Sequence, residues 1–215
     1  MKFKAVLFDL DGTLANSLYD LAASVNFVLK KHGFPTHPVD SFKYFAGDGI
    51  PTMIKRAMPK NKGEETLNIL KAEFMEYYSV HYADKTVAYD GLTELLTELK
   101  NKGIKIAVVT NKAQEAADKV VNSLFGDVFD IVMGLRPNIP AKPNPTAALT
   151  VMNELGVSPC DTAFVGDTSM DIAVGVNSGA LPVGVLWGFR ERAELEEAGA
   201  KAFAANADEL RKILL

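Results

Sequence analysis

The segment Lys4-Ala5-Val6-Leu7-Phe8-Asp9-Leu10-Asp11-Gly12-Thr13-Leu14 is an apolar run that ends in two carboxylates. Such a run is typical of a strand buried on both faces of a parallel sheet. Carboxylates are rarely buried without a partner, so Asp9 and Asp11 at the tip of this strand predict a cation or a catalytic duty. A plain strand followed by an Asp-Gly turn is the structural alternative. The longer Asp-x-Asp-Gly-Thr pattern favours a site, because Gly12 permits a sharp turn and the Thr13 hydroxyl can hold the loop.

The composition is that of a soluble globular protein. The chain has 215 residues, of which 48% are hydrophobic and 23% charged, enough for one domain with an insertion or two unequal domains. The net charge of −4 and the lack of a dense Lys/Arg block argue against nucleic acid or an anionic membrane surface as partner.

The single cysteine, Cys160, excludes an intramolecular disulfide and a thiolate-rich zinc site. No apolar run reaches the length that spans a membrane. Met1 leads directly into the first predicted strand, without a signal-peptide pattern, so we expect a cytoplasmic protein.

Strand-like and helix-like segments alternate along most of the chain. Apolar runs predict strands at residues 3–8, 104–110, 128–133, 162–166 and 181–187. Helical patterns lie between them, at 91–102, 113–124, 144–155 and 169–178. This order predicts an α/β core built on a doubly wound parallel sheet of the Rossmann-like kind.

Residues 17–85 carry no strand signal and predict a small all-helical insertion. Apolar residues at helical spacing run from Ser17 to Gly33, and Ser17 with Asp20 three residues later predicts a capped helix start. A second long helix is expected at about 64–82. The predicted domains are therefore a core of residues 1–16 and 86–215 and a helical insertion of residues 17–85.

Polar groups follow several of the predicted strands. Thr110 and Asn111 follow the second strand, Asp167 and Asp171 follow the fourth, and Lys142 precedes a helix. Parallel strands bring these ends to one edge of the sheet, where ligands bind. Together with Asp9 and Asp11 the set holds four carboxylates against one lysine, and a divalent cation would relieve their repulsion. Because every donor is an oxygen, Mg²⁺ is favoured over zinc or copper.

Four segments in order resemble the motifs of the haloacid dehalogenase-like superfamily, in its phosphatase branch. They are Asp9-Leu10-Asp11-Gly12-Thr13-Leu14, Val108-Val109-Thr110-Asn111-Lys112, Lys142-Pro143-Asn144-Pro145 and Gly166-Asp167-Thr168-Ser169-Met170-Asp171. The superfamily also contains dehalogenases, which lack an acid at the second aspartate position. The presence of Asp11 therefore argues for a phosphate ester as substrate.

The resemblance implies a role for each core residue. Asp9 would be the nucleophile that forms an aspartyl-phosphate, and Asp11 would protonate the leaving alcohol and then activate water. Thr110 and Asn111 would hold the transferring phosphoryl group through a hydroxyl and a backbone amide. Lys142 would neutralise Asp9 and the phosphate oxygens.

The resemblance also implies a metal site. Asp167 would bind Mg²⁺ directly, and Asp171 would support the metal site without binding the ion itself. A carboxylate oxygen of Asp9 and the main-chain carbonyl of Asp11 would complete the protein ligands.

In this family the helical insertion is a mobile cap that reads the leaving group. The segment Phe45-Ala46-Gly47-Asp48-Gly49-Ile50, followed by Lys55-Arg56-Ala57, resembles the cap of phosphoglycolate phosphatases. Gly47, Gly49 and Arg56 are thus candidate substrate contacts, since an amide-rich helix start suits a small anion. A tight turn between helices is the structural alternative for the two glycines.

The segment Trp187-Gly188-Phe189-Arg190 resembles the same subfamily, with Trp187 either packing or touching substrate. Two features depart from the pattern: Asn16 replaces an aspartate often found there, and residues 135–140 lack an acidic residue common before the motif lysine.

The expected function is hydrolysis of a small phosphorylated metabolite, 2-phosphoglycolate above others, by a monomer or homodimer. A pyrophosphatase or a sugar-phosphate phosphatase of the same branch is the alternative, and a phosphomutase is disfavoured because no second phosphate cradle is evident. From other classes, a signalling receiver domain is disfavoured because Asp9 follows the first strand. A catalytically inactive scaffold on this fold remains an alternative.

Overall fold

The computed structural model describes residues 2–215. The chain forms two compact units, one comprising Met1–Asn16 with Ala88–Leu215 and the other Ser17–Val87. Each unit is described by itself.

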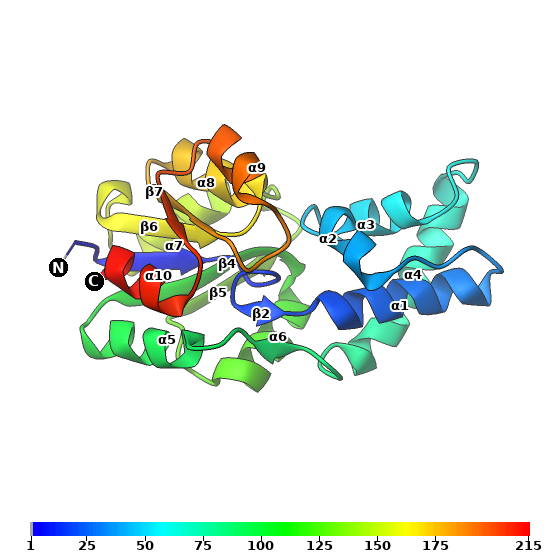
Figure 1. Ribbon diagram of the computed structural model, residues 1–215, viewed down its shortest axis with the longest axis horizontal. Helices are drawn as coiled ribbons and strands as arrows, with labels where there is room; N and C mark the ends of the chain where they lie inside the picture. The colour runs from blue at the N-terminus through cyan, green and yellow to red at the C-terminus, as the bar shows by residue number, and fades with distance from the viewer. Residues whose placement is uncertain (1) are drawn as a thin grey trace. The chain divides into compact units, whose positions relative to one another are not determined.

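The first unit is built on a six-stranded sheet in the order β5-β4-β1-β6-β7-β8 (Figure 1). Every pairing in it is parallel. The strands are β1 (Ala5–Phe8), β4 (Lys105–Ala113), β5 (Ile131–Leu135), β6 (Thr162–Gly166), β7 (Leu181–Val185) and β8 (Ala202–Ala204). The chain starts at the centre of the sheet, winds to one edge through β5, and then crosses to build the other half, which confirms the predicted doubly wound sheet.

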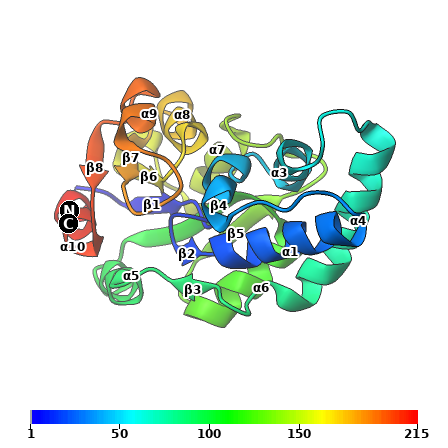
Figure 2. The same ribbon diagram turned by 45° about the vertical axis from the view of Figure 1, so that its right-hand side comes forward.

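Helices cover both faces of this sheet (Figures 1 and 2). One face carries α7 (Thr146–Leu155), α8 (Ser169–Ser178) and α9 (Arg192–Glu197), and the other α5 (Leu92–Asn101), α6 (Gln114–Phe125) and α10 (Ala207–Leu214). Right-handed crossovers produce this division, because connections that run in opposite directions along the sheet lie on opposite faces. The predicted α/β class is therefore confirmed, while β8, α9 and α10 were not predicted.

The central strand β1 is buried along its whole length, with four residues that expose none of their surface. Both of its sides face helices, which is why the sequence shows an unbroken apolar run instead of alternation. Phe164 of β6 and Val151 of α7 belong to the same buried cluster as Leu7. This packing fixes the position at which β1 ends and the first acidic residue begins.

The second unit is helical, as the missing strand signal predicted. It contains α1 (Leu18–Lys31), a short 3-10 turn η1 (Val39–Ser41), α2 (Phe42–Phe45), α3 (Ile50–Ala57) and α4 (Glu64–His81). Its core includes the fully buried side chains of Val25, Phe42, Ile54, Leu70 and Phe74. Two short strands, β2 (Ala15–Asn16) and β3 (Val87–Ala88), pair with one another where the chain leaves and re-enters the sheet-containing unit. Across residues 2–215, no helix has both the length and the apolar character needed to cross a bilayer.

The buried carboxylate of Asp20 ties the start of α1 to the end of this unit. It accepts hydrogen bonds from the backbone N–H of Lys85 (2.9 Å), the backbone N–H of Thr86 (2.8 Å) and the Thr86 hydroxyl (2.7 Å). The helix begins after Ser17 as predicted, but the predicted capping by Ser17 and Asp20 is wrong, because Ser17 makes no side-chain cap bond and Asp20 accepts from a segment more than sixty residues away.

Candidate active site

The candidate catalytic residues lie at the carboxyl edge of the sheet because the register of three neighbouring strands brings them level. Phe8 of β1 pairs with Val108 of β4 on one side and with Val165 of β6 on the other. The residues that follow these positions therefore meet. The backbone N–H of Asp9 donates to the Val165 carbonyl at 2.9 Å, which holds Asp9 beside the end of β6.

Thr110 and Asn111 lie within the end of β4, not after it as the sequence predicted. The register between β4 and β5 shifts between Val109 and Ala113, so this segment is an irregular continuation of the strand. The irregularity keeps Thr110 and Asn111 buried at the sheet edge, at 6% and 8% exposure.

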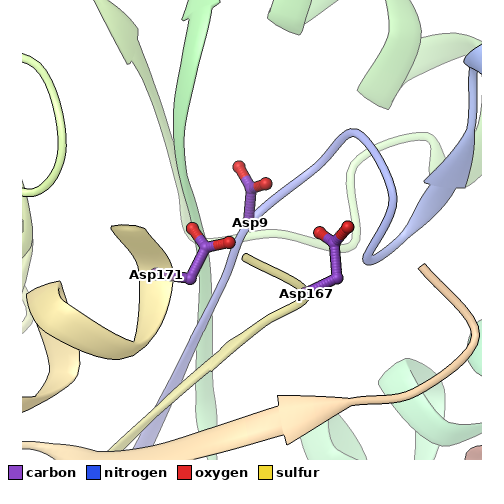
Figure 3. A group of neighbouring side chains, drawn as sticks. All are labelled: Asp9, Asp167 and Asp171. Carbon is purple, nitrogen blue, oxygen red and sulfur yellow. The ribbon is translucent and has the colours of Figure 1, made fainter. Parts of the chain in front are cut away.

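Three carboxylates converge at this edge (Figure 3). Asp9 follows β1, Asp167 follows β6 and Asp171 lies in the first turn of α8, and their oxygens come within 4.8 Å of one another. All three residues are buried. Among the residues that the structure describes, one buried side-chain oxygen lacks a hydrogen bond, and it is Oδ1 of Asp9. An all-oxygen set with an unbonded carboxylate oxygen fits a hard divalent cation.

The Lys142 ammonium partly neutralises this charge. Its Nζ lies 2.6 Å from Asp171 Oδ1, to which it donates a hydrogen bond, and 2.6 Å from Asp9 Oδ1. The second contact is an ion pair without hydrogen-bond direction, since Asp9 Oδ1 remains unbonded. Asn111 braces the lysine, because its side-chain oxygen accepts from the Lys142 backbone N–H at 2.8 Å.

The other two acids are held in fixed orientations. Oδ2 of Asp171 accepts from the backbone N–H and the hydroxyl of Thr168, which makes a capping box at the start of α8. Oδ1 of Asp167 accepts from the Thr13 hydroxyl and Oδ2 from the backbone N–H of Phe189, both at 2.8 Å. Both oxygens of Asp171 are thus engaged by protein donors, which suits a supporting acid.

Electrostatics at the site favour an added cation. Burial, together with the nearby Asp171 carboxylate, raises the pKa of Asp9 to about 6 against the opposing effect of Lys142. Burial also raises the pKa of Asp167 well above its usual range, and Asp171 and Asp9 add to the rise. Burial by itself would lower the pKa of Lys142, but the carboxylates of Asp171 and Asp9 outweigh it and raise that pKa. Three acids against one lysine leave an excess of negative charge that protons or a metal ion can balance.

Asp11 lies apart from the three-acid cluster. Both of its carboxylate oxygens accept from Lys112 Nζ at 3.0 Å, and the lysine side chain is 3% exposed. Sequence reasoning gave Lys112 no role. The available signal was its place directly after Thr110 and Asn111, at the edge that also carries Asp11.

The candidate residues of the helical unit form a local turn. Gly47 and Gly49 have φ angles of +109° and +86°, which favour glycine, and Gly49 precedes the first residue of α3. Arg56 of α3 forms an ion pair with Asp48 and donates to the carbonyls of Tyr44 and Phe45 at 3.2 and 3.1 Å. Arg56 therefore stabilises the turn, and substrate contact by these three residues stays a prediction.

A family model described as haloacid dehalogenase-like hydrolase matches residues 6–185. The chain belongs to the haloacid dehalogenase-like hydrolases. This confirms the family inferred from the four motifs and the prediction of a hydrolytic enzyme.

Named members of this hydrolase family are similar to the chain over most of its length. A phosphoglycolate phosphatase of Aquifex aeolicus (strain VF5) is 32% identical over 187 residues, 86% of each chain. One from Pasteurella multocida (strain Pm70) is 32% identical over 204 residues, 91% of each chain. The solved structure of a candidate phosphoglycolate phosphatase from Lactobacillus delbrueckii subsp. bulgaricus covers 100% of this chain and 99% of its own, with a TM-score of 0.95 and 30% identity.

Proposed function

We propose that this hydrolase is a Mg²⁺-dependent phosphatase that cleaves a small phosphate monoester through an aspartyl-phosphate on Asp9, with 2-phosphoglycolate as substrate. The observation that carries the proposal is the unbonded, buried Oδ1 of Asp9, which lies beside Lys142 and within one cluster with Asp167. A carboxylate oxygen that accepts no hydrogen bond, and whose charge one lysine balances only in part, is available both as a metal ligand and as a nucleophile. The names of the relatives support the substrate class.

The reaction would proceed in two balanced steps. A carboxylate oxygen of Asp9 attacks phosphorus while the ester oxygen leaves and takes the proton of Asp11. The ionised Asp11 then removes a proton from water, whose oxygen attacks the phosphoryl group and releases inorganic phosphate. Asp9 returns as a carboxylate and Asp11 in its protonated form.

Other residues would stabilise the charge that develops on the phosphoryl oxygens. Lys142, the Thr110 hydroxyl and the backbone amide of Asn111 are the donors, and the Asn111 side chain keeps the Lys142 backbone in place. Mg²⁺, held by Asp9, Asp167 and the Asp11 main-chain carbonyl with support from Asp171, would supply charge neutralisation between nucleophile and substrate.

Residues 17–85 would act as the cap that selects the leaving group, and the compact unit Ser17–Val87 supports this domain boundary. In this reading the turn that contains Gly47 and Gly49 offers backbone amides to the glycolate carboxylate. Arg56 would contribute by holding that turn, since its guanidinium binds Asp48 and two carbonyls.

Phosphate release from a substrate panel tests the proposal. The panel contains 2-phosphoglycolate, pyrophosphate, several sugar phosphates and para-nitrophenyl phosphate, each assayed with Mg²⁺ and with EDTA. We expect the highest kcat/KM for 2-phosphoglycolate, no turnover in EDTA and none for Asp9→Asn. A higher kcat/KM for pyrophosphate or a sugar phosphate would show that 2-phosphoglycolate is not the preferred substrate, while the proposed mechanism on Asp9 would stand. Folded protein that releases no phosphate from any ester would favour the inactive scaffold.

A further inference from the structure

The segment Trp187–Phe189, which follows β7, touches both the loop after β1 and the acid after β6. The indole Nε1–H of Trp187 donates to the Thr13 carbonyl at 3.0 Å. Two residues later, the backbone N–H of Phe189 donates to Asp167 Oδ2 at 2.8 Å. One short stretch thus joins the nucleophile loop to an acid of the three-carboxylate cluster.

Gly188 lies between these two contacts, where a side chain has no room. A Cβ added there would lie 2.5 Å from Asp167 Oδ2 and 2.5 Å from the Gly12 carbonyl oxygen, well inside contact distance. A Cβ added at Gly12, whose φ is +89°, would lie 2.7 Å from the Asp167 carboxyl carbon and 2.9 Å from Oδ1. Glycine backbones therefore close on the Asp167 carboxylate from two sides.

Each oxygen of Asp167 receives one of these donors, Oδ1 from the Thr13 hydroxyl and Oδ2 from Phe189. Two fixed donors on one carboxylate define its rotation, and each oxygen keeps a lone pair for a further ligand. The Thr13 residue that donates to Asp167 is the one whose carbonyl accepts from Trp187. Thr13, Trp187 and Phe189 are therefore linked to one another and to Asp167 by hydrogen bonds and by the chain itself.

We infer that Trp187–Phe189 positions Asp167 for the divalent cation, with Trp187 and Gly188 as positioning residues. The inference rests on the metal site of the proposed function and assigns a role to a segment outside the four motifs. The indole hydrogen bond joins the loop after β1, which contains Asp9 and Thr13, to the segment Trp187–Phe189, whose backbone N–H binds Asp167.

Trp187 is the one tryptophan of the sequence, so tryptophan emission reports on this position alone. Cation binding between Asp9 and Asp167 changes the charge beside the Thr13 loop, to which the indole is hydrogen-bonded. We expect a saturable change in tryptophan emission when Mg²⁺ is added to the metal-free protein. The change should be absent in Asp167→Asn.

Calorimetric titration with Mg²⁺, without substrate, gives the decisive measurement. We expect Gly188→Ala to weaken Mg²⁺ binding by about tenfold or more, the effect that losing a group behind a metal ligand typically has. Trp187→Phe keeps a ring and loses the N–H donor, so it should weaken binding by a smaller factor. Raising Mg²⁺ should restore most of kcat in both variants.

Gly175→Ala is the matched control for crowding. The nearest atoms that its Cβ would meet all belong to Pro182, the first at 2.9 Å, and none belongs to an acid, so it should lower the Tm and leave the Mg²⁺ affinity within twofold. Unchanged affinity in both Trp187→Phe and Gly188→Ala overturns the inference, as does a wild type that binds no Mg²⁺. If Gly188→Ala does not fold, Trp187→Phe and the emission change decide alone. Mg²⁺ binding with the expected variant effects but no phosphate release would remove the proposed function and leave this inference standing.

Discussion

Replacing Lys142 by methionine tests whether the acid cluster depends on one buried ammonium. Methionine keeps most of the apolar stem and removes the charge. In the wild type, Nζ lies 2.6 Å from Asp9 Oδ1 and 2.6 Å from Asp171 Oδ1, and the residue is 4% exposed. In the variant three buried carboxylates would face one another without this cation.

The expected loss of stability is large because a buried charge pair is broken on one side only. Such changes lower the free energy of unfolding by about 3–5 kcal/mol, and in a chain of this size each kcal/mol shifts the Tm by about 2–4 °C. We therefore expect a Tm about 6–20 °C lower in EDTA at pH 7.5.

The loss should shrink at lower pH. Burial already raises the pKa of Asp9 to about 6, and removal of Lys142 raises it further. A carboxyl group with a raised folded-state pKa binds its proton more tightly when folded, so its effect on stability becomes less favourable as pH rises through that range. The difference in Tm between variant and wild type should therefore be smaller at pH 5.5 than at pH 7.5, and Mg²⁺ should reduce it at pH 7.5.

Thermal unfolding followed by circular dichroism measures these shifts. Lys4→Met is the control, because the Lys4 ammonium pairs with Asp161 at 2.7 Å on the surface and such pairs contribute little. A Tm that falls by less than about 2 °C for Lys142→Met in EDTA at pH 7.5, or that falls more at pH 5.5, would show that the acid cluster does not depend on the Lys142 ammonium.

Three further substitutions and one pH titration probe the remaining parts of the site and the hydrogen bonds of Asp20. Asp9→Asn should lower kcat by roughly 10⁴ or more with an unchanged circular dichroism spectrum, and near-normal turnover would remove the covalent role. Asp11→Asn should slow hydrolysis of alkyl phosphates by about 10²–10⁴-fold and of activated aryl esters least, whereas equal losses would contradict an acid role. Because protons compete for Asp9, with its pKa of about 6, calorimetry should show Mg²⁺ affinity falling by up to about tenfold per pH unit below that value, and a flat profile would count against direct ligation. Asp20→Ala removes a carboxylate with three close donors and should lower the Tm by roughly 3–12 °C, so an unchanged Tm would contradict its structural role.

The sequence predicted the sheet well wherever burial alone decided the structure. The runs at residues 3–8, 162–166 and 181–187 became β1, β6 and β7 because both faces of each are covered. The run at 128–133 became Ile131–Leu135 instead, since the Asp130 carboxylate accepts from the backbone N–H of Ile106 and the strand begins after it. The three residues of β8 were missed because Ala-Phe-Ala is too short to show a pattern and pairs only through its contact with β7.

Contacts between distant parts of the chain could not be predicted in the same way. Lys112 and Asp11 are 101 residues apart, and although the sequence places both at the same sheet edge, it does not show that they pair. The donor from Phe189 to Asp167 and the acceptor role of Asp20 depend equally on tertiary packing. Local patterns identified which groups gather at the strand ends, but their hydrogen-bond partners follow only from the assembled sheet.

The hydrogen bonds between Asp20 and the Lys85–Thr86 segment bear on how enzymes with such an insertion diversify. They hold the first and last residues of the unit Ser17–Val87 close together, and both partners belong to that unit. A segment whose two ends are fastened to each other can be grafted in place of another without stretching the host scaffold. If the insertion selects the leaving group, as proposed, recombination would exchange selectivity as a module while the residues at the sheet edge stay unchanged.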